Sequence, residues 1–105
     1  RDREWFVLYF EFVLHAARTP SFAKGFARAR RDGLRELEEG VSAALAVAGA
    51  EPVVDAATLA RALSAVSYGL ALDRLVDETG VTDAVVVESL ELLIRGAVPA
   101  RGPRR

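Results

Sequence analysis

The sequence predicts an all-α domain built from four main helices, and three observations lead to that prediction. Apolar residues recur at i, i+3, i+4 and i+7 in four separate segments, which is the spacing of one helix face. Proline, glycine and threonine residues interrupt the chain between these segments. Val85–Val87 could start a strand, but no second segment offers it a partner. The length of 105 residues fits one domain, close to the size at which small domains become marginally stable.

The first predicted helix spans residues 2–17 and is unusually apolar. It ends before Thr19 and Pro20, because the residue preceding a proline is pushed out of the helical region. One apolar stripe starts at Trp5 and another at Phe6, so only a narrow polar edge remains. We therefore expect this helix to lie at the centre of the fold.

The second predicted helix spans residues 20–48 and ends at Gly49. Thr19 is placed as its N-cap, and Pro20 takes the first helical position, where its missing N–H group costs nothing. Three glycines inside the helix weaken it by roughly 1 kcal/mol each, so a bend is expected. The stripe expected to face inward consists of Phe22, Phe26, Ala29, Leu34, Leu37, Val41 and Leu45.

The third predicted helix carries an uncharged segment, residues 62–72, in its middle. Asp55 is expected to cap it, and it runs to about Glu78, after which Gly80 suits a left-handed C-cap. Because the uncharged segment is apolar on more than one side, it must be buried on more than one side. So short a chain has few residues to cover those sides, which implies a ligand, a partner subunit or both.

The fourth predicted helix spans residues 83–95, with Thr82 as its cap and Gly96 as its end. One of its faces carries Val86, Leu90 and Leu93, and an adjacent face carries Val85 and Leu92. The remaining residues, 99–105, are rich in proline, glycine and arginine and are expected to be disordered.

Composition and charge exclude several functional classes. The formal net charge of −1 gives no basic surface for nucleic acid. The chain has no cysteine, which excludes disulfides and thiolate metal sites and fits a reducing interior. Its longest uncharged runs are well short of the roughly 18 apolar residues that a membrane span needs. We expect a cytoplasmic protein with no contact to a membrane.

No arrangement of residues predicts catalysis, a metal site or a cofactor. His15 is the single histidine, and Glu11 beside it at i, i+4 makes a weak metal pair. Ser64 and Ser67 have no evident acid partner, and no glycine-rich phosphate loop follows a strand. We therefore expect no enzyme.

The order and lengths of the segments resemble those of a known family. An aromatic-rich helix (residues 5–12) is followed by a Thr-Pro-Ser break at residues 19–21 and a long arginine-bearing helix. A proline loop with an aspartate cap then leads to the helix that contains Tyr-Gly-Leu-Ala-Leu at residues 68–72, and a final amphipathic helix follows. Over residues 4–97 this pattern resembles the C-terminal domain of TetR-type (tetracycline-repressor-like) transcriptional regulators.

The resemblance implies a bacterial homodimeric repressor. In that family an N-terminal helix-turn-helix binds DNA, and the C-terminal domain dimerises and binds a small-molecule effector. The last two helices usually pair with their copies in a four-helix bundle. We expect residues 1–98 to be such a domain; the helix-turn-helix is absent from this chain, so DNA binding is not expected of these residues.

Small and apolar residues of the last two helices are expected to form the dimer interface. Ala65 and Gly69 let two helices approach closely, and burial at about 25 cal/mol per Å² would stabilise a marginal domain. The alternative is that these residues pack within one subunit. The predicted interface consists of Ala65, Gly69, Leu72, Val76, Val86, Leu90 and Leu93.

The effector is expected to be a small apolar or aromatic molecule held by aromatic rings and a few hydroxyl groups, as is common in small-molecule sites. The alternative is that the rings fill the core, so that the domain is a structural dimerisation module without a ligand. The predicted ligand-binding residues are Trp5, Tyr9, Phe12, Val13, His15, Phe22, Phe26, Leu63, Ser64, Ser67 and Tyr68.

Overall fold

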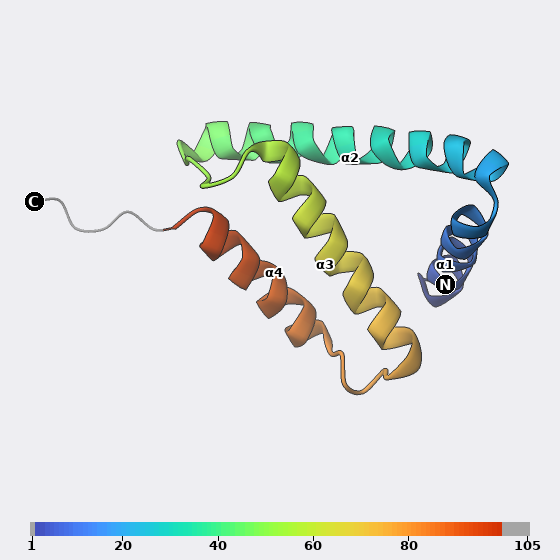
Figure 1. The fold of residues 1–105 in the computed structure, drawn as a ribbon. Coiled ribbons are helices and arrows are strands. Elements are labelled where there is room, and N and C mark those ends of the chain that lie inside the picture. The colour runs from blue at the N-terminus through green and yellow to red at the C-terminus, as the bar shows by residue number, and fades with distance from the viewer. Residues whose placement is uncertain (1, 100–105) are drawn as a thin grey trace, which may run out of the picture.

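The computed structural model describes residues 2–99, and these form four helices and no strands (Figure 1). The helices are α1 (Asp2–Arg18), α2 (Pro20–Ala48), α3 (Ala56–Val76) and α4 (Asp83–Ala97). This confirms the predicted all-α fold class, and each helix ends close to its predicted position. Of the tail expected to be disordered, residues 100–105 lie outside the described residues.

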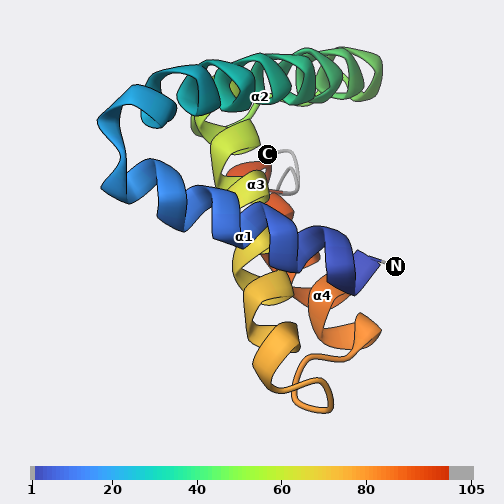
Figure 2. The same cartoon turned by 90° about the vertical axis from the view of Figure 1, so that its right-hand side faces the viewer.

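Helix α3 occupies the centre of the arrangement. It packs against each of the other three helices, whereas α4 contacts α3 alone among the described helices. The long helix α2 runs along one end of α3, and α1 crosses α3 on the side away from α4 (Figures 1 and 2). The expectation that the first helix is central is wrong, because none of the described residues of α1 is buried.

Local capping explains why the helices begin and end where they do. The Asp55 carboxylate accepts a hydrogen bond from the Thr58 N–H group at 2.7 Å and caps α3. The Thr82 hydroxyl accepts one from the Val85 N–H group at 3.2 Å and caps α4. Gly49 ends α2 with a left-handed φ of 62°.

Two predicted caps differ from the structure. Thr19 stands at the N-cap of α2, but its hydroxyl makes no cap hydrogen bond and instead lies 3.5 Å from His15 Nδ1. Gly80 is not left-handed, since Gly49 is the one glycine with positive φ among the described residues. The turn after α3 forms differently, because the Asp77 carboxylate accepts a hydrogen bond from the Gly80 N–H group at 3.1 Å.

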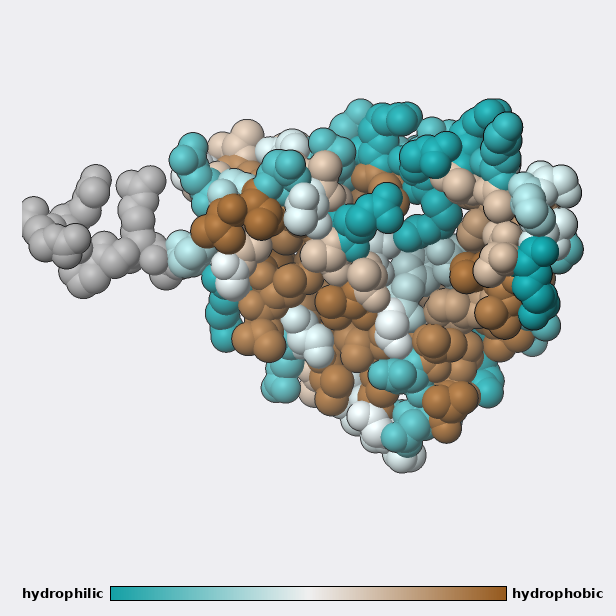
Figure 3. Space-filling model, viewed as in Figure 1, coloured by the Kyte–Doolittle hydropathy of each residue, from teal (hydrophilic) through white to brown (hydrophobic). Residues whose placement is uncertain are grey.

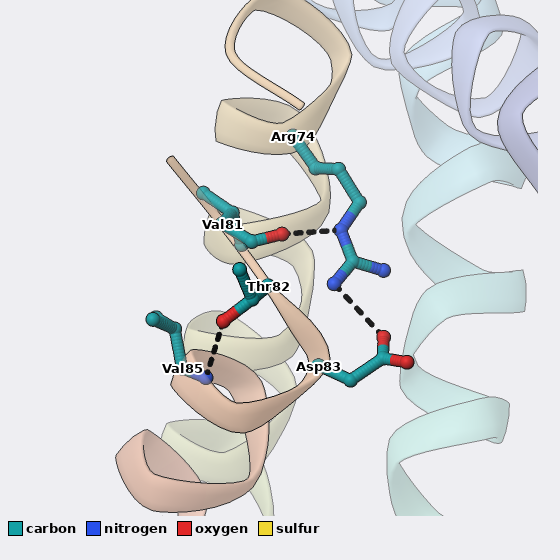
Figure 4. A network of polar contacts seen from close by, with 5 residues as sticks. All are labelled: Arg74, Val81, Thr82, Asp83 and Val85. Atoms are coloured by element: carbon teal, nitrogen blue, oxygen red, sulfur yellow. Dashed lines mark hydrogen bonds and ion pairs between the residues drawn. The ribbon is translucent and has the colours of Figure 1, made fainter. Parts of the chain in front are cut away.

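Hydrogen bonds join α4 to α3 at the turn between them, and to the loop before α3 at the opposite end. At the turn, Arg74 Nε donates to the carbonyl of the buried residue Val81 at 2.8 Å, and Arg74 Nη2 contacts Asp83 at 3.0 Å (Figure 4). At the other end, the Val53 N–H group donates to the Ala97 carbonyl at 2.7 Å. The two helices therefore form one hairpin, which packs against α1 and α2 through α3.

The subunit is thin and has a small core. It measures 20 Å along its shortest axis, which is about two helix diameters. Its radius of gyration is 16.3 Å, compared with about 13 Å for a compact domain of this length. The buried apolar side chains in the described region are Leu59, Ala60, Val81 and Ala97. Many large apolar residues therefore remain exposed in a single subunit.

Candidate functional site

Aromatic rings fill the space between α1, α2 and α3, where the sequence predicted a pocket. Tyr9 stacks on Tyr68 with ring centroids 4.6 Å apart, and Trp5 stacks on Tyr9 at 5.3 Å. Phe26 packs at 5.9 Å from Tyr9 and also at 5.9 Å from Phe22. These rings lie close enough to form a packed layer, so this part of the predicted pocket is occupied by side chains.

Three further predicted ligand residues lie towards the outer end of this layer. Phe12 packs on Phe22 at 5.9 Å, and the exposed ring of His15 packs on the same phenylalanine at 4.7 Å. Val13 is half-buried on α1. None of the cavities described here is lined by these residues.

A partly open cavity of about 440 Å³ lies between α2, α3 and α4. It lies where α2 and α4 both pack on α3 while their backbones stay apart within the described chain. Four predicted ligand residues line it, namely Leu63, Ser64, Ser67 and Tyr68. Its other lining residues are Arg30, Gly33, Leu34, Leu37 and Leu90.

Arg30 is the residue that the sequence analysis missed. Its guanidinium carbon lies 5.2 Å from the Tyr68 ring centroid and 5.9 Å from that of Tyr9, within cation–π range. Its Nη2 donates a long hydrogen bond of 3.4 Å to the buried Ser64 hydroxyl. Arg30 thus joins the aromatic layer to the cavity.

The spacing of residues along α2 could have shown that Arg30 faces the inside of the fold. Arg30 follows Phe26 by four residues and precedes Leu34 by four, so it lies on the same stripe of α2. The prediction assigned Ala29 to that stripe, but Ala29 is exposed and Arg30 is half-buried. Arginine can bury its aliphatic stem on such a stripe, which a purely hydrophobic pattern overlooks.

The surroundings of Tyr9 change the pKa of its phenol group. Burial raises the pKa of Tyr9 above its ordinary value, while the positive charge of Arg30 acts in the opposite direction. The Tyr9 hydroxyl therefore stays protonated at neutral pH and remains a neutral hydrogen-bonding group.

The opposite side of α3 is apolar and exposed. Ala65, Gly69, Leu72 and Val76 all lie there, with Leu72 47% and Val76 86% exposed. Apolar side chains gather over α3 and α4 on this face, whereas hydrophilic ones cover α2 (Figure 3). A groove of about 620 Å³ lies between α3 and α4. None of these four residues lines it, and its lining includes Leu59, Ala62, Val66, Ser89, Leu92, Leu93 and Gly96.

The predicted interface residues of α4 divide between two sides. Leu93 lines the outer groove, but Leu90 lines the inner cavity, and Val86 lies beside Phe6 in a second inner space. The most exposed large apolar residue of α4 is Leu92, which is 71% exposed and was assigned to the adjacent face. Ser89 and Gly96 precede and follow it at helical spacing along the same groove.

No group of three or more histidine, cysteine, aspartate or glutamate side chains among the described residues could hold a metal ion. No helix in this part of the chain is long and apolar enough to cross a bilayer.

Comparison with known protein families decides the identity of the domain. The sequence model of the BetI-type transcriptional repressor C-terminal domain matches residues 1–99. The chain belongs to this family. It is therefore a C-terminal domain of a TetR-type transcriptional regulator, as the order of its segments predicted. The family consists of regulators of transcription and not of enzymes. No match is found among curated proteins or among solved structures.

Proposed function

We propose that this BetI-type domain binds a small-molecule effector on one side of α3 and a second copy of itself on the other. One observation carries this proposal, which is that α3 presents two different faces. Leu63, Ser64 and Tyr68 line the inner cavity, while Gly69 and Leu72 belong to the exposed outer face. One helix thus connects a ligand-sized space with an uncovered apolar surface.

The inner cavity has the properties of an effector site. Its volume of about 440 Å³ lies within the range of small-molecule pockets. Leucines supply apolar lining, and Arg30, Ser64 and Tyr68 supply a few polar groups that would orient a ligand.

The outer face is large enough for a small dimer interface. With 21 and 15 residues, α3 and α4 are about 30 Å and about 22 Å long, and at about 10 Å width each they make a face of roughly 500 Å². A specific interface buries at least about 1,000 Å² of accessible surface in total over its two partners. Pairing of two α3–α4 hairpins would therefore cover the exposed apolar side chains in a four-helix bundle.

Regulation would follow from the position of α3. An effector in the cavity would contact α2, α3 and α4 together. It would thereby change how the hairpin of α3 and α4 packs against α1 and α2. In the dimer this would change the distance between two N-terminal helix-turn-helix domains, through which the repressor would bind DNA in the bacterial cytoplasm. Such a shift requires that the effector bind one dimer geometry more tightly than the other.

A thermal-shift screen of small apolar and aromatic compounds tests the effector site. We expect some compounds to raise the Tm, because a ligand that binds only the folded state stabilises it. The cavity can be filled by Gly33→Leu, since a Cβ atom added at Gly33 meets no heavy atom within 4 Å. This variant should fold and lose the response to those compounds.

The matched control is Gly40→Leu. Gly40 lies two turns further along α2, has equal space around it and does not line the cavity. This variant should keep the response. A screen without hits on the original protein would instead favour a purely structural dimerisation module, which is the second candidate function.

A further inference from the structure

Arg30 carries a positive charge that no carboxylate in the described chain neutralises. Arg30 belongs to none of the ion pairs seen between described residues, which include Arg35 with Asp32, Arg74 with Asp83 and Arg95 with Glu91. Of the residues that line the inner cavity, Arg30 alone is charged. A half-buried cation without a counter-ion leaves the cavity electrostatically positive.

The guanidinium is held in place and still has free donors. It lies over the rings of Tyr68 and Tyr9, and one of its five N–H groups is directed to Ser64 Oγ at 3.4 Å. Planar guanidinium groups bind carboxylates through two parallel hydrogen bonds. The Ser64 hydroxyl can also donate its own proton, because it accepts from Arg30 through its oxygen.

The rest of the cavity requires an apolar molecule. Leu34, Leu37, Leu63 and Leu90 line it together with Gly33. A single guanidinium balances a single negative charge. A dianion such as a phosphate monoester would place a second charge near these leucines without a partner, which is costly.

We infer that the effector is a small amphipathic monocarboxylate, whose carboxylate binds Arg30 and Ser64 and whose apolar body contacts the leucines. This inference rests on the proposed effector site and adds the chemical class of the ligand. A cationic ligand is disfavoured, because Arg30 already lies over the Tyr68 ring face that a cation would use.

Matched probes separate charge from shape. 4-Phenylbutanoate and octanoate are compared with their primary amides and with trimethylammonium compounds of the same tails, by isothermal titration calorimetry on the protein. We expect each carboxylate to bind at least about tenfold more tightly than its amide, because hydrogen bonds to charged groups are the stronger ones. The ammonium compounds should bind more weakly than the amides.

Variants of Arg30 assign this preference to one side chain. Arg30→Gln should bind the carboxylate and the amide equally, whereas Arg30→Lys should keep part of the preference for the carboxylate. Arg28→Gln is the control, because Arg28 is exposed on the same helix. The comparison of probes on the original protein is valid even if a variant at Arg30 fails to fold.

Two results would overturn the inference. Amides or ammonium compounds that bind as tightly as the carboxylates would show that charge is not recognised, although effector binding itself would stand. Carboxylates that do not bind at all would also refute the proposed class. The broader screen with Gly33→Leu then decides separately whether the cavity binds any effector.

Discussion

Arg74 joins the end of α3 to the start of α4. Its guanidinium donates to the Val81 carbonyl at 2.8 Å and contacts the Asp83 carboxylate at 3.0 Å (Figure 4). The bond to the carbonyl carries more weight than the ion pair, because the Asp83 side chain is almost fully exposed and surface pairs contribute little.

Replacement of Arg74 therefore tests how much this side chain stabilises the turn between α3 and α4. Arg74→Gln should lower the free energy of unfolding by about 1–2 kcal/mol, since a hydrogen bond from a charged donor is lost. Urea titration at one fixed protein concentration measures this. Arg95→Gln, which removes an ion pair of 3.8 Å from a 77% exposed side chain, should change stability by less than about 0.5 kcal/mol. Equal effects of the two substitutions would contradict the role of Arg74.

Asp55 makes the stability of α3 depend on pH. The Thr58 N–H group holds the pKa of Asp55 below its ordinary value. A carboxylate with a lowered pKa in the folded state contributes stability above its unfolded pKa, and this is lost as the pH falls through its folded pKa. Acid should therefore weaken the cap of α3.

The variant Asp55→Asn separates capping from titration. Asparagine caps helices about as well as aspartate but carries no charge. We expect thermal melts at pH 7 to be similar for both proteins, and the fall in Tm between pH 5 and pH 3 to be smaller for the variant. The same fall in both proteins would show that Asp55 does not contribute to the acid sensitivity.

At the scale of the helices, Gly40 inside α2 and Gly49 directly after it have opposite effects on stability. Gly49 ends the helix with φ at 62°, and hydrogen bonds from Gly49 N and Ala50 N to the Ala46 and Leu45 carbonyls close it. Gly40 lies inside the helix, where a Cβ atom meets no other heavy atom within 4 Å.

Alanine substitution at these two glycines should shift stability in opposite directions. Gly49→Ala should destabilise the protein by about 1 kcal/mol, because a left-handed backbone strains a side chain. Gly40→Ala should stabilise it by roughly 0.5–1 kcal/mol through its higher helix propensity. Chemical denaturation of both variants measures the two changes in the free energy of unfolding. Stabilisation by Gly49→Ala would contradict the structure of this cap.

Helix positions were predictable because their signals are local. Asp55, Thr82 and Gly49 mark helix ends through contacts to residues three or four positions away. The faces of α4 were not predictable in the same way. Val86 and Leu90 on one face, and Leu92 on another, are all apolar, and periodicity alone does not say which face meets the same subunit.

The residues of the candidate site were also predictable only in part. Leu63, Ser64, Ser67 and Tyr68 were predicted to bind a ligand, and the structure brings all four to one cavity. The aromatic residues of α1 and α2 were assigned to the same pocket, but they pack on one another, since aromatic spacing is equally typical of a core. Arg30 was missed because the inward stripe of α2 was defined by apolar residues alone, with Ala29 assigned to it.

At the scale of the whole molecule, a single copy of the domain leaves large apolar side chains exposed. Helix α4 contacts only α3 among the described helices, and the outer side of the hairpin exposes Leu72, Val76 and Leu92. In the proposed dimer, a second copy would cover this face and stabilise a domain with so few buried side chains. Dimerisation and stability should therefore be coupled, so that the Tm rises with protein concentration.

A charge on the outer face tests this directly. Leu92→Glu places a carboxylate in the proposed interface, where burial without a partner is costly. Val47→Glu is the control, because Val47 is also apolar and is 91% exposed, but it lies near the end of α2 and does not line the groove. The first variant should dissociate the dimer, and the second should leave it intact.

Sedimentation velocity at tens of micromolar protein is the most direct test of the claim that the outer face of α3 and α4 joins two subunits. We expect a particle of about twice the chain mass of 11.3 kDa for the original protein and for Val47→Glu, and a monomer for Leu92→Glu. A monomer of the original protein at this concentration, or a Leu92→Glu variant that remains a dimer, would contradict the claim.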